Sequence, residues 1–267
     1  MSALTKVFER LKFRKEGALI GYITAGDPTP PCTPLLAEAL INGGVDILEL
    51  GLPFSDPIAD GATIQAASAR ALNAGTTPKK VLEMAQEIKR KHDVPIIIMT
   101  YYNPVFRMGI EKFFSLARDC LVDGLIVPDL PLEEAGDYRK MAISYDVDTI
   151  FLAAPSTSAE RLRRIVASSS GFLYLVSHFG VTGEKESLED STIHLVKRVL
   201  PYTTGHVPLA VGFGISKPAH VRSIIEAGAD AVIVGSAFVK VVQKNVGNID
   251  KTVAEIRRLA QELKAAT

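Results

Sequence analysis

The stretch VDILELGLPFSDPIADGATIQAASARALN, residues 45–73, contains one apolar run, one loop and one helical pattern in succession. The run Val45–Gly51 is short and has no regular alternation of apolar and polar residues. Such runs are typical of strands that are buried on both faces of a parallel sheet. A loop rich in Pro, Asp and Gly follows, and Ala62–Asn73 then has helical spacing. The stretch therefore predicts one βα repeat.

The same pattern recurs along the chain. Eight apolar runs are expected to be strands: Ala18–Thr24, Val45–Gly51, Val94–Tyr101, Gly124–Pro128, Asp148–Ala153, Gly171–Ser177, Val207–Ile215 and Ala229–Gly235. Helical patterns are found at Pro34–Asn42, Ala62–Asn73, Pro78–Lys91, Ile110–Val122, Leu132–Tyr145, Ser158–Ser169, Leu188–Leu200, Lys217–Ala227 and Asp250–Ala265. Eight repeats in about 250 residues are typical of an α/β fold of the closed (β/α)8 type, the TIM barrel. The alternative, an open doubly wound sheet, usually has a GxGxxG motif after its first strand, and Thr24–Pro28 contains none.

Residues 1–267 are predicted to form a single TIM-barrel domain, because no linker or low-complexity segment divides the chain. Two extra helices are expected. Met1–Gly17 predicts an amphipathic N-terminal helix that covers one end of the domain, with Leu4, Val7, Phe8 and Leu11 at helical spacing. Ala237–Gln243 predicts a short extra helix after the eighth strand.

The composition argues against several classes of protein. The 30 basic and 30 acidic side chains give a formal net charge of zero, which disfavours binding to nucleic acid or to anionic membranes. No apolar run reaches the ~18 residues of a membrane span, and the N-terminus has no apolar signal-peptide core. The two cysteines, Cys32 and Cys120, form no CxxC motif and suit a reducing compartment. A cytoplasmic protein with a small-molecule substrate is expected.

Two carboxylates are candidate catalytic groups, because active sites of TIM barrels lie at the carboxyl ends of the strands. Glu49 lies inside an apolar run, on the same face as Ile47 and Gly51. An apolar pocket would raise its pKa and let it exchange protons near neutral pH. The alternative is a structural carboxylate held by backbone donors. Asp60 ends the following loop, and its alternative interpretation is a helix N-cap.

The absence of two kinds of residue pattern limits the reaction mechanisms that this chain could use. None of the eight runs contains a lysine, which argues against a Schiff-base aldolase. The five histidines, at 92, 178, 194, 206 and 220, form no pair with metal-ligand spacing near a strand end, so no metal is expected. Acid/base chemistry by carboxylates remains, with Tyr22 and Tyr174 as possible polar aids. Tyr174 lies within a predicted strand, and packing in the core is its alternative role.

Glycine-bearing turns follow the last three predicted strands: Gly180–Gly183, Gly212–Ser216 and Gly235-Ser236. Glycines allow close backbone approach, and a helix N-terminus supplies N–H donors, so these turns predict a phosphate site. The alternative is that the glycines serve tight turns. The polar stretch Gly180–Ser191 is either a lid or a solvated loop. The paired surface tyrosines that begin Tyr101–Phe106, with Pro53 and Pro131, indicate a surface for substrate or a partner protein.

These segments closely resemble the tryptophan synthase alpha subunit family. The resemblance is carried by Glu49–Gly61, Gly180–Gly183, Gly212–Ile215 and Gly235–Lys240, and it extends from about Val7 to Lys240. It implies a lyase that cleaves indole-3-glycerol phosphate to indole and glyceraldehyde 3-phosphate by a retro-aldol reaction. It also implies a partner, the beta subunit, which would hold pyridoxal phosphate and receive indole in an α2β2 complex. No cofactor is implied for this chain.

The resemblance also implies roles for matching residues. Glu49 would move protons to and from the substrate, Asp60 would accept a hydrogen bond from the indole N–H, and Tyr174 would lie beside Glu49. The other implied substrate contacts are Tyr22, Met99, Thr182 and Phe213, and the implied phosphate contacts are Gly183, Gly214, Gly235 and Ser236. The implied beta-subunit contacts are Pro53, Asp56, Asn103, Phe106, Asp129 and Pro131.

Three positions differ from the residues common in the family: Tyr22 replaces Phe, Met99 replaces Leu and His178 replaces Arg. Three alternatives to the implied function stay open. They are a free-standing indole-releasing lyase, another phosphosugar isomerase or epimerase with similar glycine loops, and a non-catalytic regulatory subunit. The pair Glu49 and Asp60 argues against the last of these.

Overall fold

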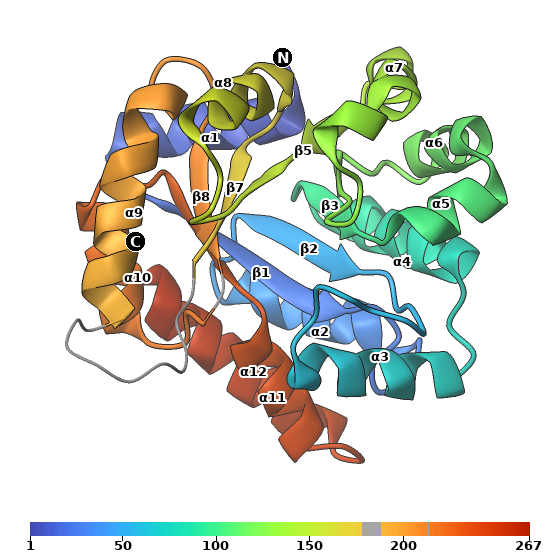
Figure 1. The fold of residues 1–267 in the computed structure, drawn as a ribbon. Coiled ribbons are helices and arrows are strands. Elements are labelled where there is room, and N and C mark those ends of the chain that lie inside the picture. Colours follow the sequence, from blue (N-terminus) through green and yellow to red (C-terminus); the bar gives the residue numbers. More distant parts are fainter. Residues whose placement is uncertain (178–187, 213) are drawn as a thin grey trace.

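The computed structural model describes residues 1–177, 188–212 and 214–267, and within them it has nine parallel strands in one sheet. The strands are β1 Ala18–Thr24, β2 Ile47–Gly51, β3 Ile96–Met99, β4 Gly124–Ile126, β5 Asp148–Ile150, β6 Leu152–Ala153, β7 Leu173–Val176, β8 Leu209–Gly212 and β9 Ala231–Val234. Helices surround the strands on the outside (Figure 1).

The sheet closes on itself. Its strand order is β5-β4-β3-β2-β1-β9-β8-β7-β6, so the first and last members are β5 and β6. These two strands are consecutive pieces of one predicted run, Asp148–Ala153, and only Phe151 separates them. β5 pairs with β4, and β6 pairs with β7. The predicted eight-stranded TIM barrel is therefore confirmed, with its fifth strand divided into two short pieces.

The helices follow the strands in the expected alternation. In the described ranges they are α1 Ala3–Arg14, α2 Cys32–Asn42, α3 Ala62–Asn73, α4 Pro78–Lys91, α5 Tyr102–Met108, α6 Ile110–Asp119, η1 Leu132–Glu134, α7 Gly136–Ser144, α8 Ala159–Ser168, α9 Leu188–Thr203, α10 Pro218–Glu226, α11 Ser236–Lys244 and α12 Ile249–Lys264. The extra helix α11 begins one residue before its predicted start. No helix in the described residues is long and apolar enough to cross a membrane.

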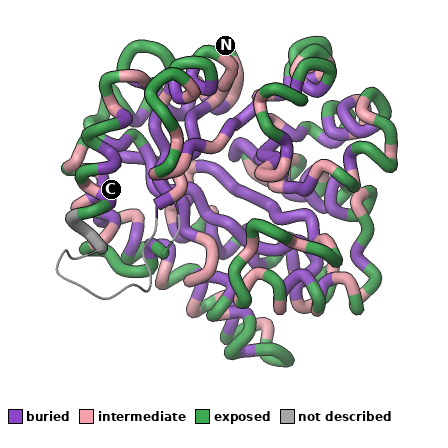
Figure 2. The backbone as a smooth tube through the Cα atoms, viewed as in Figure 1, coloured by how far each residue is buried: buried purple, intermediate pink, exposed green. Residues whose placement is uncertain are grey.

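Alternate side chains of the strands enter two separate cores. In β2, Leu48 and Leu50 join the layer between the sheet and the helices, whereas Ile47 faces the barrel interior. Buried residues are concentrated along the strands, and the exposed ones lie on the outer helices and loops (Figure 2). The interior core also contains Ile97 and Ile233. Because neighbouring side chains point to opposite faces, each strand fills both cores at once.

The N-terminal helix α1 closes the end of the barrel where the strands begin. The predicted apolar residues Leu4, Val7, Phe8 and Leu11 are all buried, and they join the interior core. Burial of each such side chain contributes roughly 1.5–3 kcal/mol. The interior is therefore filled at this end, and an open site is left to the opposite end.

Most predicted runs are a few residues longer than the observed elements, and two differences have a clear structural cause. The helix expected to stop at Leu200 continues through Pro201 to Thr203. Pro201 lies in the last turn and has no N–H to donate, yet the chain stays helical beyond it, and the Thr204 N–H donates to the Leu200 carbonyl. The helix α5, which was not predicted, begins at Tyr102, whose N–H donates to Asp129 Oδ1 at 2.8 Å. A residue 27 positions away thus determines where this helix starts.

Candidate active site

A cavity of about 230 Å³ lies at the carboxyl ends of the strands. Its lining is mostly apolar, and it contains the two candidate carboxylates. The lining residues are Tyr22, Glu49, Ala59, Asp60, Gly61, Ala62, Thr63, Ile64, Met99, Ile126, Pro128, Leu152, Tyr174, Gly214, Ile215, Ile233, Gly235 and Ser236. Eight predicted site residues that are distant from one another in the sequence thus meet in one cavity. They are Glu49, Asp60, Tyr174, Tyr22, Met99, Gly214, Gly235 and Ser236.

Glu49 is buried in the wall of this cavity, with only 1% of its surface exposed. It lies in β2 beside Tyr22 of β1, its partner in the strand register. Among the described residues, its Oε2 atom has no hydrogen-bond partner. Burial, and to a smaller extent the Asp60 charge, raises the pKa of Glu49 to about 8. A structural carboxylate would instead be held by backbone donors, so the geometry favours the catalytic interpretation.

Asp60 approaches the cavity from the loop between β2 and α3. The N-cap of α3 is Gly61 and no side chain caps this helix, so the N-cap interpretation of Asp60 is wrong. Tyr101 holds this loop: the Ala59 N–H donates to the Tyr101 hydroxyl at 2.9 Å. Burial raises the pKa of Asp60, while a hydrogen bond from Tyr101 opposes that shift by favouring the ionised form. Asp60 is therefore held beside Glu49 with a pKa above its ordinary value, and the Tyr101 hydrogen bond limits that rise.

Two tyrosines cover the interior wall where glycines leave room for their rings. A Cβ added at Gly51 would lie 2.1 Å from the Tyr22 hydroxyl oxygen, and one at Gly212 would lie 2.5 Å from the Tyr174 ring. The Tyr22 hydroxyl is 3.2 Å from Thr24 Oγ1. Burial raises the pKa of both tyrosines, which keeps them protonated. Gly212, expected in a phosphate turn, thus makes space for an aromatic ring.

The short helix α11 presents its N-terminus to the cavity. Gly235 is its N-cap, no side chain caps it, and both Gly235 and Ser236 line the cavity. The backbone N–H groups of a first helical turn have no partner within the helix. Gly214 lies near them with a φ of 78°, a conformation that favours glycine. The described lining includes no Lys or Arg, so any anion here would be bound by the backbone.

The predicted partner contacts lie in the segments that follow three neighbouring strands. Asp56, Asn103 and Pro131, which follow β2, β3 and β4, are exposed, and the Phe106 side chain is 65% exposed. Asp129 is half-buried. Pro53 is buried within the chain and offers a partner little surface.

The prediction of two surface tyrosines is wrong for Tyr101, which is 3% exposed and packs against Phe54 with ring centroids 5.3 Å apart. Sequence reasoning missed its role in holding the Asp60 loop. The available signal was its position directly after a strand that neighbours β2.

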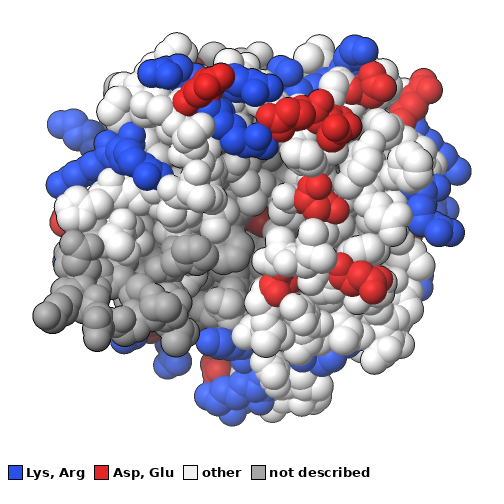
Figure 3. All heavy atoms as spheres, viewed as in Figure 1, with Lys and Arg blue, Asp and Glu red and all other residues white. Residues whose placement is uncertain are grey.

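Four residues of interest, His178, Thr182, Gly183 and Phe213, lie outside the described residues, as does most of the expected lid, Gly180–Ser191. In the described ranges, no group of three or more His, Cys, Asp or Glu side chains could hold a metal ion. On the face that Figure 3 shows, Lys and Arg side chains lie mainly along the edges, whereas several acidic side chains lie further in among uncharged residues.

Comparison with known proteins identifies the family. The family model for the tryptophan synthase alpha chain matches residues 8–267. The tryptophan synthase alpha chain of Methanosarcina acetivorans is 48% identical over 262 residues, which are 98% of this chain and 93% of that protein. That of Solibacter usitatus is 46% identical, over 99% of this chain and 97% of the relative.

Solved structures agree with the sequence relatives. A chain of tryptophan synthase from M. tuberculosis, in an aminoacrylate-bound form, superposes with a TM-score of 0.88 at 34% identity and covers 100% of this chain and 99% of that one. A chain from the tryptophan synthase a2b2 complex of Pyrococcus furiosus gives a TM-score of 0.83 at 38% identity, over 93% and 97% of the two chains. With this fold, this cavity and these relatives, the chain belongs to the tryptophan synthase alpha chain family.

Proposed function

We propose that this chain cleaves indole-3-glycerol phosphate to indole and glyceraldehyde 3-phosphate. The observation that carries the proposal is Glu49, a buried carboxyl group with a raised pKa in an apolar cavity, next to a second carboxyl group on Asp60. Two carboxyl groups in different environments are the minimum equipment for acid/base cleavage without lysine or metal.

In the proposed reaction, the indole ring of the substrate is the electron sink. With a pKa of about 8, Glu49 is largely protonated at neutral pH and can first act as an acid. It protonates the indole carbon that bears the side chain, and the ring becomes a cationic indolenine. Glu49 then takes the hydroxyl proton from the adjacent side-chain carbon. That carbon becomes the aldehyde, the carbon–carbon bond breaks, and its electron pair returns to the ring to give indole.

Asp60 stabilises the positive charge of the indolenine by accepting a hydrogen bond from the ring N–H. Its hydrogen bond from Tyr101 favours the ionised form that this role needs. Tyr22, Met99 and Tyr174 form apolar walls for the ring, and Thr182 and Phe213 complete them in the proposal. The phosphate binds to backbone N–H groups of Gly214, Gly235 and Ser236 at the start of α11, together with Gly183.

We further propose that indole passes to a beta subunit that docks on the rim formed by the loops after β2, β3 and β4. Two large apolar side chains on this rim, Ile58 and Phe106, are 82% and 65% exposed. Exposed apolar groups rimmed by polar residues are typical of protein interfaces. The proposed assembly is an α2β2 complex in the cytoplasm, with pyridoxal phosphate only in the beta subunit.

The test is an assay of indole release from indole-3-glycerol phosphate by the purified chain, with and without a beta subunit from a related organism. We expect release in both cases and a faster rate in the complex. The Asp60→Asn variant should lose most turnover and keep the melting temperature of the wild type, because Asp60 does not cap α3. Absence of indole release in the complex would overturn the proposed reaction, and an unchanged rate would instead favour a free-standing lyase.

A further inference from the structure

We propose that the ion pair between Asp27 and Arg70 positions Asp60. The pair fixes α3 on the barrel, and α3 in turn fixes the loop that carries Asp60. Asp27 lies in the loop after β1, and Arg70 lies in the last turn of α3. The effect on catalysis that we infer rests on the proposed function, whereas the effect on the Asp60 loop does not.

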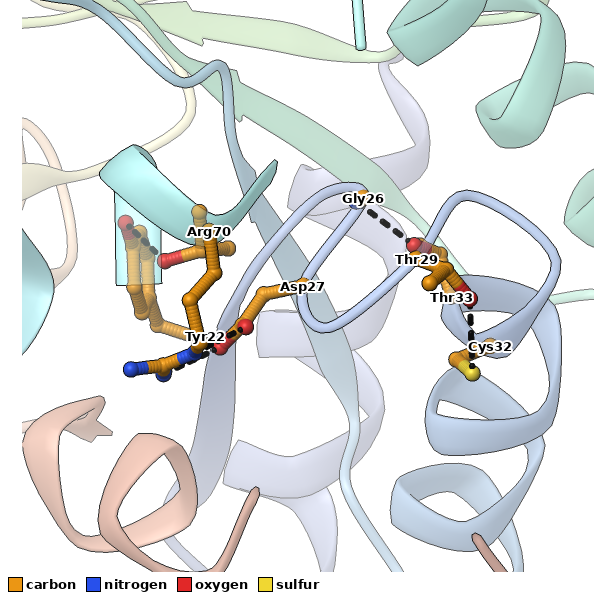
Figure 4. A network of polar contacts seen from close by, with 8 residues as sticks. Tyr22, Gly26, Asp27, Thr29, Cys32, Thr33 and Arg70 are labelled. Atoms are coloured by element: carbon orange, nitrogen blue, oxygen red, sulfur yellow. Dashed lines mark hydrogen bonds and ion pairs between the residues drawn. The ribbon is translucent and has the colours of Figure 1, made fainter. Parts of the chain in front are cut away.

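The pair has the geometry of a strong, directed contact. Arg70 Nε donates to Asp27 Oδ1 at 2.7 Å, and Arg70 Nη2 donates to Asp27 Oδ2 at 2.9 Å. The Asp27 side chain is 2% exposed and the Arg70 side chain 25%. Figure 4 shows Arg70 reaching from its helix to the loop that carries Asp27. Two parallel hydrogen bonds between planar groups fix orientation as well as distance.

The helix α3 packs on α11 and β1, but it completely buries no large side chain. Its fully buried residues are all small, Ala67, Ser68 and Ala71. By contrast, the next helix, α4, buries Val81, Leu82, Met84, Ala85 and Ile88. Small side chains make a smooth surface that permits a helix to slide or rotate, whereas large ones interlock with the layer beneath. The position of α3 therefore depends unusually strongly on its polar contact with Asp27.

The Asp27 loop is itself held rigidly, so it can serve as a fixed point. The Gly26 N–H donates to Thr33 Oγ1 at 2.8 Å, which ties the loop to the first turn of α2. Gly26 has a φ of 86°, and a Cβ at this position would lie 1.9 Å from Thr76 Oγ1. Thr76 follows α3 in the chain, so the loop touches the α3 segment at a second point.

The other end of α3 leads to the active site. Its first residues, Ala62, Thr63 and Ile64, line the cavity, and Asp60 precedes them by two positions. The Tyr101 hydroxyl holds Ala59 on the far side of Asp60. Asp60 is thus supported from two directions, by Tyr101 directly and by α3, whose distant end is tied to Asp27. A shift of α3 along its axis would move Asp60 relative to Glu49.

The experiment compares Arg70→Met with Lys89→Met in the full chain. Lys89 in α4 forms an ion pair with Asp123 at 2.8 Å, and both side chains are mostly buried, at 13% and 16% exposure. This pair also joins a helix to the barrel, but it lies at the opposite end of the strands. Both variants should lose stability, and Lys89→Met is therefore the control for loss of an ion pair without displacement of Asp60.

At a temperature where both variants are folded, we expect Arg70→Met to lower kcat for indole release by about 10- to 100-fold with a smaller change in KM. Lys89→Met should stay within about twofold of wild type. Arg70→Lys keeps the charge and loses the paired hydrogen bonds, and its kcat should be intermediate. In an Asp60→Asn background, Arg70→Met should cause little further loss, because both changes act through the same group.

Amide hydrogen exchange supplies a second readout that needs no turnover. Residues 58–66 should exchange faster in Arg70→Met than in wild type, and at the wild-type rate in Lys89→Met. Equal kcat values for the two single variants, multiplied losses with Asp60→Asn, or unchanged exchange in residues 58–66 would each overturn the positioning role. An inactive wild-type complex would overturn the proposed function alone, and the exchange data would still decide whether Arg70 orders the loop.

Discussion

Carboxylates occur at both ends of the barrel, and their surroundings differ. Where the strands begin, Asp46, Asp123 and Asp230 each accept a hydrogen bond from the backbone of the neighbouring strand, donated by Leu19 at 2.9 Å, Ile96 at 2.7 Å and Leu209 at 2.8 Å. Two of them also pair with lysines, Asp46 with Lys264 and Asp123 with Lys89. Where the strands end, Glu49 Oε2 has no hydrogen-bond partner among the described residues.

This difference shows how one chemical group serves two purposes in one fold. A carboxylate that accepts a backbone hydrogen bond from the next strand ties the two strands together, which contributes to stability. A carboxyl group buried without such partners has a raised pKa, which costs stability and creates a proton donor. Burial also raises the pKa of two aspartates where the strands begin, Asp148 and Asp230. Asp148 is closer to Glu49 in kind, because its Oδ2 has no hydrogen-bond partner among the described residues.

The largest expected effect is on turnover, and the prediction compares two carboxylates of one predicted strand. Glu49→Gln should lower kcat for indole release by about 1,000-fold, because the amide cannot transfer the proton. Asp46→Asn, three residues earlier, should leave kcat within about twofold, because its amide oxygen can still accept the Leu19 N–H. Steady-state assays on both variants check this, and more than a few per cent of turnover in Glu49→Gln would contradict the role of Glu49.

The second prediction concerns stability at the end where the strands begin. Asp123→Ala should lower the free energy of unfolding by about 3 kcal/mol, because Lys89 and the Ile96 N–H both lose a buried partner. Asp137→Ala removes an exposed ion pair with Lys140 and should cost less than about 1 kcal/mol. Urea unfolding measures the free energy of unfolding of both variants. Equal decreases would show that the contacts of Asp123 do not stabilise the fold more than an exposed ion pair does.

The third prediction concerns the rings that cover the other end. Gly212→Ala should cost about 1–3 kcal/mol, because the new methyl group would lie 2.5 Å from the Tyr174 ring. Gly136→Ala is the matched control: no atom lies within 4 Å of its added Cβ, so this change should be neutral or slightly stabilising. Thermal unfolding measures both, and a Gly212→Ala variant as stable as the control would mean that Tyr174 moves aside freely.

The fourth prediction concerns the dependence of stability on pH, where the effect of a single pH step is small. Glu49 binds its proton more tightly in the folded chain, with a pKa of about 8 against an ordinary value of 4.5. Its protonation therefore supports folding at low pH, and this support is lost as the pH rises from about 4.5 through 8, at no more than about 1.4 kcal/mol per pH unit. Urea midpoints between pH 5 and 9 should fall less steeply in Glu49→Gln, and parallel curves would contradict the raised pKa.

The barrel and part of its site could be predicted from the sequence. Each buried strand appears in the sequence as an apolar run, and a glutamate within such a run can be recognised without a structure. Tyr101 was misplaced because its partners, Ala59 and Asp60, lie more than 40 positions away in the chain. The ring space at Gly51 and Gly212 was missed because the clash lies between neighbouring strands. The start of α5 also depended on a distant residue, Asp129.

Periodicity and composition alone predicted the fold class and the N-terminal helix and made Glu49 and Asp60 candidates, because these properties repeat or stand out locally. The roles of the two carboxylates came from the family resemblance. Tertiary structure decided which carboxylate is satisfied and which is not. It also decided which tyrosine lines the cavity, as Tyr22 does, and which holds a loop, as Tyr101 does. The physical reason is that a pKa, a clash or a hydrogen bond depends on atoms that folding alone brings within a few ångströms of each other.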